Sequence, residues 1–217
     1  MIDAAIIAGV KRFLPSEFGS DLQSEKALEL IRQFFQGKVD TAEYLKGKES
    51  EGLSCTRLSQ GLFSSCNAIK IGYMGFDLKT DKAMLIDEGE GRWSTTTLPT
   101  IELALKNAIL DIDGTTNHIV YVAPFTVSQN DMLAALERVT NSTWAVTRID
   151  GERQKDLGKQ KFAKGDFGGA PLIVSYINCV EGHGGNFATY RETWNDRLGL
   201  PKESLDAALK IVLADAN

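Results

Sequence analysis

The chain has 217 residues, of which 43% are hydrophobic and 24% are charged, and its formal net charge is −5. This length and composition predict a folded core, built as one large domain or as one domain with a smaller lobe. No lysine- and arginine-rich run is typical of nucleic-acid binding, no apolar stretch is long enough to span a bilayer, and no signal peptide is evident. We therefore expect neither nucleic acid nor membrane as a partner.

The three cysteines, Cys55, Cys66 and Cys179, are scattered along the chain. An odd, scattered set predicts reduced thiols in an intracellular compartment, here the cytoplasm. Neither of the two histidines, His118 and His183, has the spacing to a cysteine or an acid that a zinc site requires. We expect no metal site.

Predicted helices and strands alternate through the first 60 residues. Gly9 ends the first helix, and Pro15 ends the first strand because proline offers no N–H. Helices are expected at residues 2–9, 25–35 and 38–48, with a break near Gly37, and strands at 12–14 and 53–58. This alternation is typical of a parallel α/β sheet.

The pattern changes after about residue 80. The stretches KAMLIDE (82–88) and RWSTTTL (92–98) flank a Gly-Glu-Gly turn, which predicts a β-hairpin. Further strands are expected at 118–123 and 144–150, and helices at 102–110, at 131–140 with a cap at Ser128 or Asn130, and from Pro201 to 214. This half is expected to form a smaller α+β lobe.

No glycine-rich phosphate-binding motif stands between a predicted strand and helix. The nearest match, residues 182–185 (GHGG), fits a turn better than a phosphate-binding loop. The stretch from Gly151 to Lys159 departs from a P-loop, because Gln160 stands where a Mg²⁺-binding hydroxyl belongs. Spacing leaves a Ser-His-Asp triad open, but no G-x-S-x-G motif supports it.

Lys38 stands at the predicted start of a helix, just after Gly37. The positive end of a helix dipole and partial burial disfavour an ammonium ion, so we expect a lowered pKa and a lysine suited to acid–base chemistry. Spacing alone favours an ordinary surface lysine. It likewise favours an exposed tyrosine for Tyr44, which forms a Tyr-x-x-x-Lys pattern with Lys48.

Three early stretches carry a resemblance to a known family: AGVKRFLPSEFGSD (8–21), FFQGKVDTAEYLKGK (34–48) and LSCTRLSQGLF (53–63). They resemble the isoflavone-reductase-like branch of the NmrA-like family, atypical relatives of short-chain dehydrogenases. KAMLIDEGEGRWSTTTLPTIELALKNAIL, TVSQNDMLAALERVT and EGHGGNF are similar to the fungal members. The resemblance implies an α/β fold: a Rossmann-like parallel sheet in residues 1–64 and a C-terminal α+β substrate lobe in 65–217, from which about 94–125 returns to the sheet.

The resemblance also implies NADPH-dependent reduction of a small aromatic or secondary metabolite by hydride transfer. Lys38 matches the family's catalytic lysine, which leaves Tyr44 as scaffold. The implied cofactor contacts are Pro15, Ser16, Glu17, Phe18, Ser59, Gln60 and Gly61. The expected substrate contacts, chosen from positions after predicted strand ends, are Phe18, Phe63, Met74 and Tyr176.

The chain departs from the family pattern in two ways. The family often has Asn-Pro-Gly-Pro-Phe where this chain has Ser-Gln-Gly-Leu-Phe (59–63), so an asparagine near the nicotinamide is replaced. The glycine-rich first βαβ half, on the order of eighty residues in a doubly wound fold, is also missing. An incomplete sheet is expected to expose an edge and to favour low stability or self-association through that edge. A non-catalytic dinucleotide-sensing or partner-binding regulator and an inactive remnant remain the alternative functions.

Overall fold

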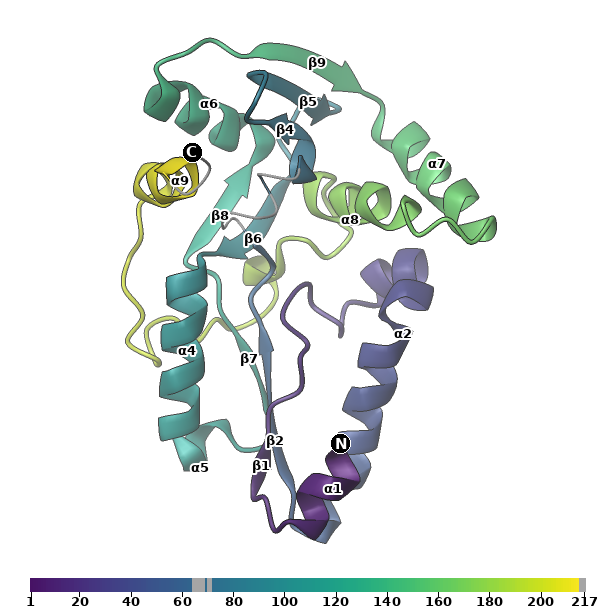
Figure 1. The fold of residues 1–217 in the computed structure, drawn as a ribbon, viewed down its shortest axis with the longest axis vertical. Coiled ribbons are helices and arrows are strands. Elements are labelled where there is room, and N and C mark those ends of the chain that lie inside the picture. Colours follow the sequence, from purple (N-terminus) through teal and green to yellow (C-terminus); the bar gives the residue numbers. More distant parts are fainter. Residues whose placement is uncertain (64–68, 70–71, 215–217) are drawn as a thin grey trace.

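A three-stranded parallel sheet occupies one end of the molecule (Figure 1). The computed structural model describes residues 1–63, 69 and 72–214. The sheet contains β1 (Arg12–Phe13), β2 (Ser54–Ser59) and β7 (His118–Tyr121), in the spatial order β1-β2-β7, and both pairs of neighbours are parallel. The parallel α/β sheet predicted from the alternation of elements is confirmed.

Helices cover both faces of this sheet, as a parallel sheet requires (Figure 1). On one side lie α1 (Ile2–Ile7) and α2 (Glu25–Gly47), followed by the short helix η1 (Glu49–Glu51). On the other side lie α4 (Leu98–Leu110) and α5 (Ile112–Thr115). The apolar face of α4 packs on Leu58 and Val120 of the sheet, whereas Leu45 of α2 packs near Leu53 and Cys55.

The break predicted near Gly37 is wrong, because α2 runs through Gly37 without interruption. The helix kinks earlier, at Ile31, where φ is −139° and ψ is 18°. Ala27 and Ile31 pack in one cluster with residues of α8, whereas Leu28 and Val39 pack in another with Leu22. The bend therefore lies at a residue that is buried against α8, and not at the glycine.

The other end of the molecule contains two further three-stranded sheets (Figure 1). One is β3 (Leu62–Phe63), β6 (Arg92–Thr96) and β8 (Phe125–Ser128); the other is β4 (Phe76–Asp77), β5 (Lys82–Ile86) and β9 (Ala145–Ile149). Around them lie α6 (Gln129–Thr140), α7 (Gly151–Ala163), α8 (Gly169–Cys179), α9 (Leu205–Ala214), η2 (Tyr73–Gly75) and η3 (Phe187–Thr189). None of the described helices combines the length and apolar character needed to cross a membrane.

The predicted hairpin of residues 82–98 is wrong, because β5 and β6 belong to different sheets. β5 pairs with β4 and β9, whereas β6 pairs with β3 and β8. The connecting Gly91 lies so close to the end of α8 that a Cβ there would fall 1.7 Å from the carbonyl oxygen of Cys179. The chain therefore passes under α8 instead of folding back on β5.

Three further expectations can be compared with the structure. Ser128 caps α6 in a reciprocal capping box with Asp131, which confirms the predicted cap. The last helix begins at Leu205, not at Pro201. The stretch compared with a P-loop belongs to the helix α7, in which Gly151 N donates to Asp87 and Arg153 N to the N-cap residue Asp150, so it forms no phosphate-binding loop. Neither α7 nor α8 was predicted from the sequence.

Gly61 allows a close approach between the segment after β2 and β6. Its φ is +72°, and a Cβ there would lie 1.9 Å from the carbonyl oxygen of Ser94. Gly52 has φ +84° but nothing within 4 Å of the same position. We expect Gly52→Ala to lower the free energy of unfolding by about 1–2 kcal/mol, from left-handed strain alone. Gly61→Ala should lower the free energy of unfolding by about 1–3 kcal/mol more than Gly52→Ala does, because its Cβ would overlap the carbonyl oxygen of Ser94. Equal losses in urea unfolding would contradict this.

Candidate active site

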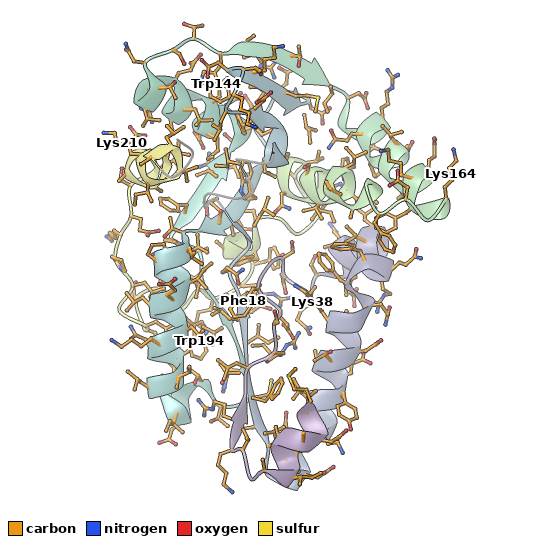
Figure 2. All side chains as sticks on the ribbon, in the orientation of Figure 1. Phe18, Lys38, Trp144, Lys164, Trp194 and Lys210 are labelled. Atoms are coloured by element: carbon orange, nitrogen blue, oxygen red, sulfur yellow. The ribbon has the colours of Figure 1, made fainter. Side chains whose placement is uncertain are left out.

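Lys38 reaches from α2 to the segment that follows β1. Its Nζ donates a hydrogen bond to the carbonyl oxygen of Glu17 at 2.5 Å, and lies 5.8 Å from the centre of the Phe35 ring. Figure 2 shows Lys38 and Phe18 at the same level, in the region between α2 and α4. The lysine is thus held at the carboxyl end of a parallel strand, where α/β proteins assemble their sites.

The pKa of Lys38 is lowered from its ordinary value, chiefly because burial removes water from the ammonium group, while the charge of Glu17 acts in the opposite direction. The lowered pKa was expected from two causes, partial burial and the helix dipole, and burial is the one that acts. The dipole is not a cause, because Lys38 lies inside α2, well past its N-cap at Ser24.

Glu17 connects Lys38 to the central strand. Its carboxylate accepts a hydrogen bond from Nε of Arg57 on β2 at 2.5 Å, and its own side chain is 6% exposed. Burial raises the pKa of Glu17, and the bond and charge of Arg57 partly offset this. The ion pair fixes the segment whose carbonyl oxygen holds Lys38.

A second ion pair lies at the start of α2. Asp21, 2% exposed, accepts hydrogen bonds from Nε of Arg191 at 2.9 Å and from the hydroxyl of Tyr121 at 3.0 Å. The Arg191 guanidinium lies 5.5 Å from the ring centre of Tyr121 and 5.3 Å from that of Tyr190. Burial and the Asp21 charge raise the pKa of Tyr121, so this hydroxyl stays protonated. The carboxylate of Asp21 therefore balances the positive charge of Arg191.

Gln60 is the most unusual polar residue of the site. It follows β2 directly and is completely buried, and neither its Oε1 nor its Nε2 has a hydrogen-bond partner among the described residues. A buried amide without partners costs about 1–3 kcal/mol. A ligand that reached this position could supply the missing bonds, which makes Gln60 a candidate binding residue.

A pocket of about 580 Å³ opens beside the second ion pair. Its walls are the start of α2, the turn of residues 180–186 and the segment that carries Tyr190 and Arg191. Lys38 does not line it. Another pocket, of about 490 Å³, lies between α2 and the β2–β7 face, with Arg57 and Cys55 among its residues.

The structure brings the two predicted cofactor segments together. Gly61 N donates to the carbonyl oxygen of Gly19 at 2.9 Å, and Ser59 Oγ contacts the same oxygen at 3.5 Å. Pro15 and Glu17 are buried, Phe18 is half-buried and Ser16 is exposed. Whether these residues contact a cofactor stays a prediction.

Three of the four predicted substrate residues, Phe18, Met74 and Tyr176, lie in different parts of the fold. Phe18 packs beside the cluster that includes Leu58 and Val120. Met74 is 4% exposed in the core of the other half, and Tyr176 is buried in α8. The side chain of Phe63 lies outside the described part of the structure. Their substrate role stays a prediction, to which this geometry adds support only at Phe18.

Tyr176 belongs to a separate titratable cluster. Its hydroxyl donates to Glu152 and lies 3.1 Å from Nε2 of His183, while Lys155 lies 5.1 Å from its ring centre. Burial, together with Glu152, raises the pKa of Tyr176 to about 12. Burial also lowers the pKa of His183. The cluster anchors the 182–185 stretch, which is a turn as predicted. Tyr44, also as predicted, is an exposed side chain beside Lys48.

Several residues of the site escaped the sequence analysis: Asp21, Arg57, Tyr121, Tyr190 and Arg191. Asp21 and Arg57 stand inside the stretches that carried the family resemblance, so proximity to those motifs could have identified them. Arg191 is separated from Asp21 by 170 residues and carries no local signal. Among residues 1–63, 69 and 72–214, no three His, Cys, Asp or Glu side chains gather in a way that could hold a metal ion.

A model of the NmrA-like family matches residues 1–164. The chain belongs to the NmrA-like family. This NmrA-like protein is 38% identical over 213 residues to the oxidoreductase aprR of Aspergillus flavus, a match that covers 98% of this chain and 71% of aprR. The family resemblance seen in the sequence is therefore confirmed.

Solved structures share the fold of this NmrA-like chain. A leucoanthocyanidin reductase from Vitis vinifera, in a binary complex with NADPH, superposes with a TM-score of 0.73 at 17% identity, covering 98% of this chain and 72% of that one. An isoflavone reductase gives a TM-score of 0.70 at 21% identity, covering 97% and 69%. At such identities the likeness establishes the fold alone, which is the predicted Rossmann-like α/β fold.

Proposed function

We propose that this NmrA-like protein is an oxidoreductase that reduces a small aromatic metabolite with NADPH, using Lys38 as the proton donor. The observation that carries the proposal is the part-buried lysine, with a lowered pKa, at the carboxyl end of a parallel strand. The similarity to the oxidoreductase aprR supports the reaction class. The cytoplasm is the compartment we propose for it, from the reduced cysteines.

The residues after β1 and β2 fit a nicotinamide cofactor. Within the described part of the chain, the amide N–H₂ and the amide oxygen of the buried Gln60 have no partner. They complement a carboxamide group, which also carries one donor pair and one acceptor. Glu17, Phe18 and Ser59 would form the rest of this wall. When bound, the cofactor supplies the hydride. Gln60 then takes the part of the asparagine that the family often has nearby.

Lys38 would deliver a proton to the oxygen or carbon that becomes basic as the substrate is reduced. Its Nζ is oriented by the carbonyl oxygen of Glu17, and the Glu17–Arg57 pair holds that carbonyl in place. A lowered pKa brings the ammonium closer to the range in which proton transfer is efficient. We place the reacting part of the substrate beside Lys38 and Phe18.

Titration of the purified chain with NADPH, followed by cofactor fluorescence, tests the proposal. We expect wild type to bind NADPH, and Gln60→Leu to bind about tenfold more weakly, because one hydrogen-bonded amide contributes about 1.5 kcal/mol at most. The same substitution should raise the free energy of unfolding without cofactor by about 1–3 kcal/mol, since it removes unsatisfied buried polar atoms. Gln36→Leu, at an exposed position of α2, is the control. It should leave NADPH binding unchanged and should alter stability by no more than about 0.5 kcal/mol, since it removes only an exposed hydrogen bond to Asp40.

Two results would contradict the proposal. One is the absence of NADPH binding by folded wild-type protein at millimolar cofactor. The other is a Gln60→Leu variant that gains stability but binds NADPH as wild type does, because Gln60 would then have no part in cofactor binding.

One observation favours a second function, that of a non-catalytic binding or sensing protein. The 580 Å³ pocket has the volume of a small-molecule site, with a tyrosine ring and glycine backbone in its walls, yet Lys38 does not line it. A ligand held only there would not meet the lysine. An aromatic ligand that binds with equal affinity to wild type and to Lys38→Met, without NADPH oxidation, would favour this function.

A further inference from the structure

Strand β9 (Ala145–Ile149) is an open edge of the β4-β5-β9 sheet. It pairs with β5 along one side, and no described strand pairs with its other side. Four of its five residues are exposed, whereas β2, β6, β7 and β8 are mainly buried or half-buried. Figure 1 shows β9 at the outer margin of the molecule, beyond β4 and β5.

The register of β9 identifies which backbone groups point outward. Ala145 N donates to the carbonyl oxygen of Asp81, and the carbonyl oxygen of Ile149 accepts from Asp87 N. In a parallel pair the residues that bond to the neighbouring strand alternate, so residues 145, 147 and 149 point their N–H and C=O groups at β5. Val146 and Arg148 therefore point theirs away from the sheet.

The edge carries none of the usual protection against strand pairing. Natural edge strands are blocked by proline, bulges or charges that project over the edge. The sequence of β9, AVTRI, contains no proline and one charge, and the guanidinium of Arg148 is turned back to the carbonyl oxygen of Asp87 at 2.9 Å and to Glu88 at 3.5 Å. Val146, two residues before Arg148 in the strand, is 43% exposed.

We propose that β9 pairs with β9 of a second copy of this chain, antiparallel and about a two-fold axis at Thr147. In this register Val146 of each copy faces Arg148 of the other, and each of these two pairs exchanges both N–H···O=C bonds. All the outward groups of Val146 and Arg148 are then satisfied. The result is one continuous six-stranded sheet across the two copies.

Charge distinguishes this register from its neighbours. An axis at Arg148 would set the two guanidinium groups directly opposite each other, which destabilises a strand pair. An axis at Val146 would set Arg148 against Trp144, whose N–H already donates to Glu137 at 3.1 Å. The axis at Thr147 avoids both problems, so the edge complements itself better than it does in the shifted registers.

Disulfide trapping tests the register directly. In an antiparallel pair, residues on the axis that do not exchange hydrogen bonds have Cα atoms about 4.5 Å apart, within reach of a disulfide. We expect T147C to form a covalent dimer under mild oxidation, and V146C, at an adjacent exposed position, to form little. Every variant carries Cys66→Ser, and the parent of the series, whose other cysteines Cys55 and Cys179 are buried, should form none. Equal trapping of both variants would overturn the proposal.

Val146→Pro tests the association itself. The proline removes an N–H that points away from β5, so the fold is expected to survive, as proline is tolerated at sheet edges. Light scattering after gel filtration, over a series of concentrations, should find wild type as a dimer and Val146→Pro as a monomer with an unchanged circular dichroism spectrum. A wild type that stays monomeric, or a folded Val146→Pro dimer, would overturn the proposal. If Val146→Pro fails to fold, the comparison of disulfide trapping between T147C and V146C still tests whether β9 pairs with β9.

Discussion

Replacing Lys38 with methionine is expected to lower kcat/KM for the proposed reduction by about 10²- to 10⁴-fold, the usual contribution of a positioned general acid. Methionine keeps the length and apolar stem of lysine but holds no proton. Lys38→Arg should be nearly as inactive, because a guanidinium stays protonated and cannot deliver its proton. Lys46→Met, at an exposed position of the same helix, is the matched control and should retain wild-type activity.

The pH dependence separates proton donation from a purely structural role of Lys38. As an acid it must be protonated, so kcat/KM of wild type should fall as pH rises through its pKa, which lies below 10.5. This decline should be absent from the residual activity of Lys38→Met. A variant with wild-type turnover, or with an unchanged alkaline decline, would rule out Lys38 as the proton donor.

The stability of Lys38→Met should change in the opposite direction to its activity. Because the folded pKa is lowered, the folded chain binds fewer protons at this site than the unfolded chain, and stability from this group is lost as pH falls through the folded pKa. At neutral pH the charged lysine therefore opposes folding. If the Lys38→Met variant is less active than wild type but at least as stable, Lys38 contributes to activity and not to stability.

The order of elements in the first half of the fold was predicted correctly because its signals are local. The short strand β1, the helix α2 and the six-residue strand β2 were all expected, although the break within α2 was misplaced. The Ser128 cap of α6 is equally local, since the capping box spans four residues. Where residues close in sequence determine the end of a helix, as Ser128 and Asp131 do for α6, the predicted and observed ends agree.

Long-range packing explains what the sequence analysis missed. Nothing in KAMLIDEGEGRWSTTTL indicates that Gly91 meets the carbonyl of Cys179, yet that contact separates β5 from β6. The kink of α2 lies at Ile31, which packs against residues of α8 that are far away in the sequence. In the site, Lys38 was identified from its motif, but its environment was not, because Glu17 and Arg57 meet only after the strands pair.

Asp21→Ala is expected to cost about 1.5–3 kcal/mol of unfolding free energy, because it removes the charged acceptor of two hydrogen bonds. The side chain of Asp21 is 1% exposed, and its loss leaves the hydroxyl of Tyr121 without this acceptor. The Arg191 side chain, 32% exposed, keeps water and the carbonyl oxygen of Gln23 as partners, which limits the loss. Urea unfolding, followed by circular dichroism, measures the loss.

The matched control is Asp206→Ala, which removes the partner of Arg138. That pair has two short contacts, of 3.1 and 2.7 Å, but its side chains are 58% and 37% exposed. An exposed ion pair contributes at most about 1 kcal/mol. A loss at Asp21 no larger than the loss at Asp206 would show that the Asp21–Arg191–Tyr121 network does not stabilise the fold. A large loss would mean that the start of α2 is fixed by a residue 170 positions away, which joins the C-terminal segment to the sheet.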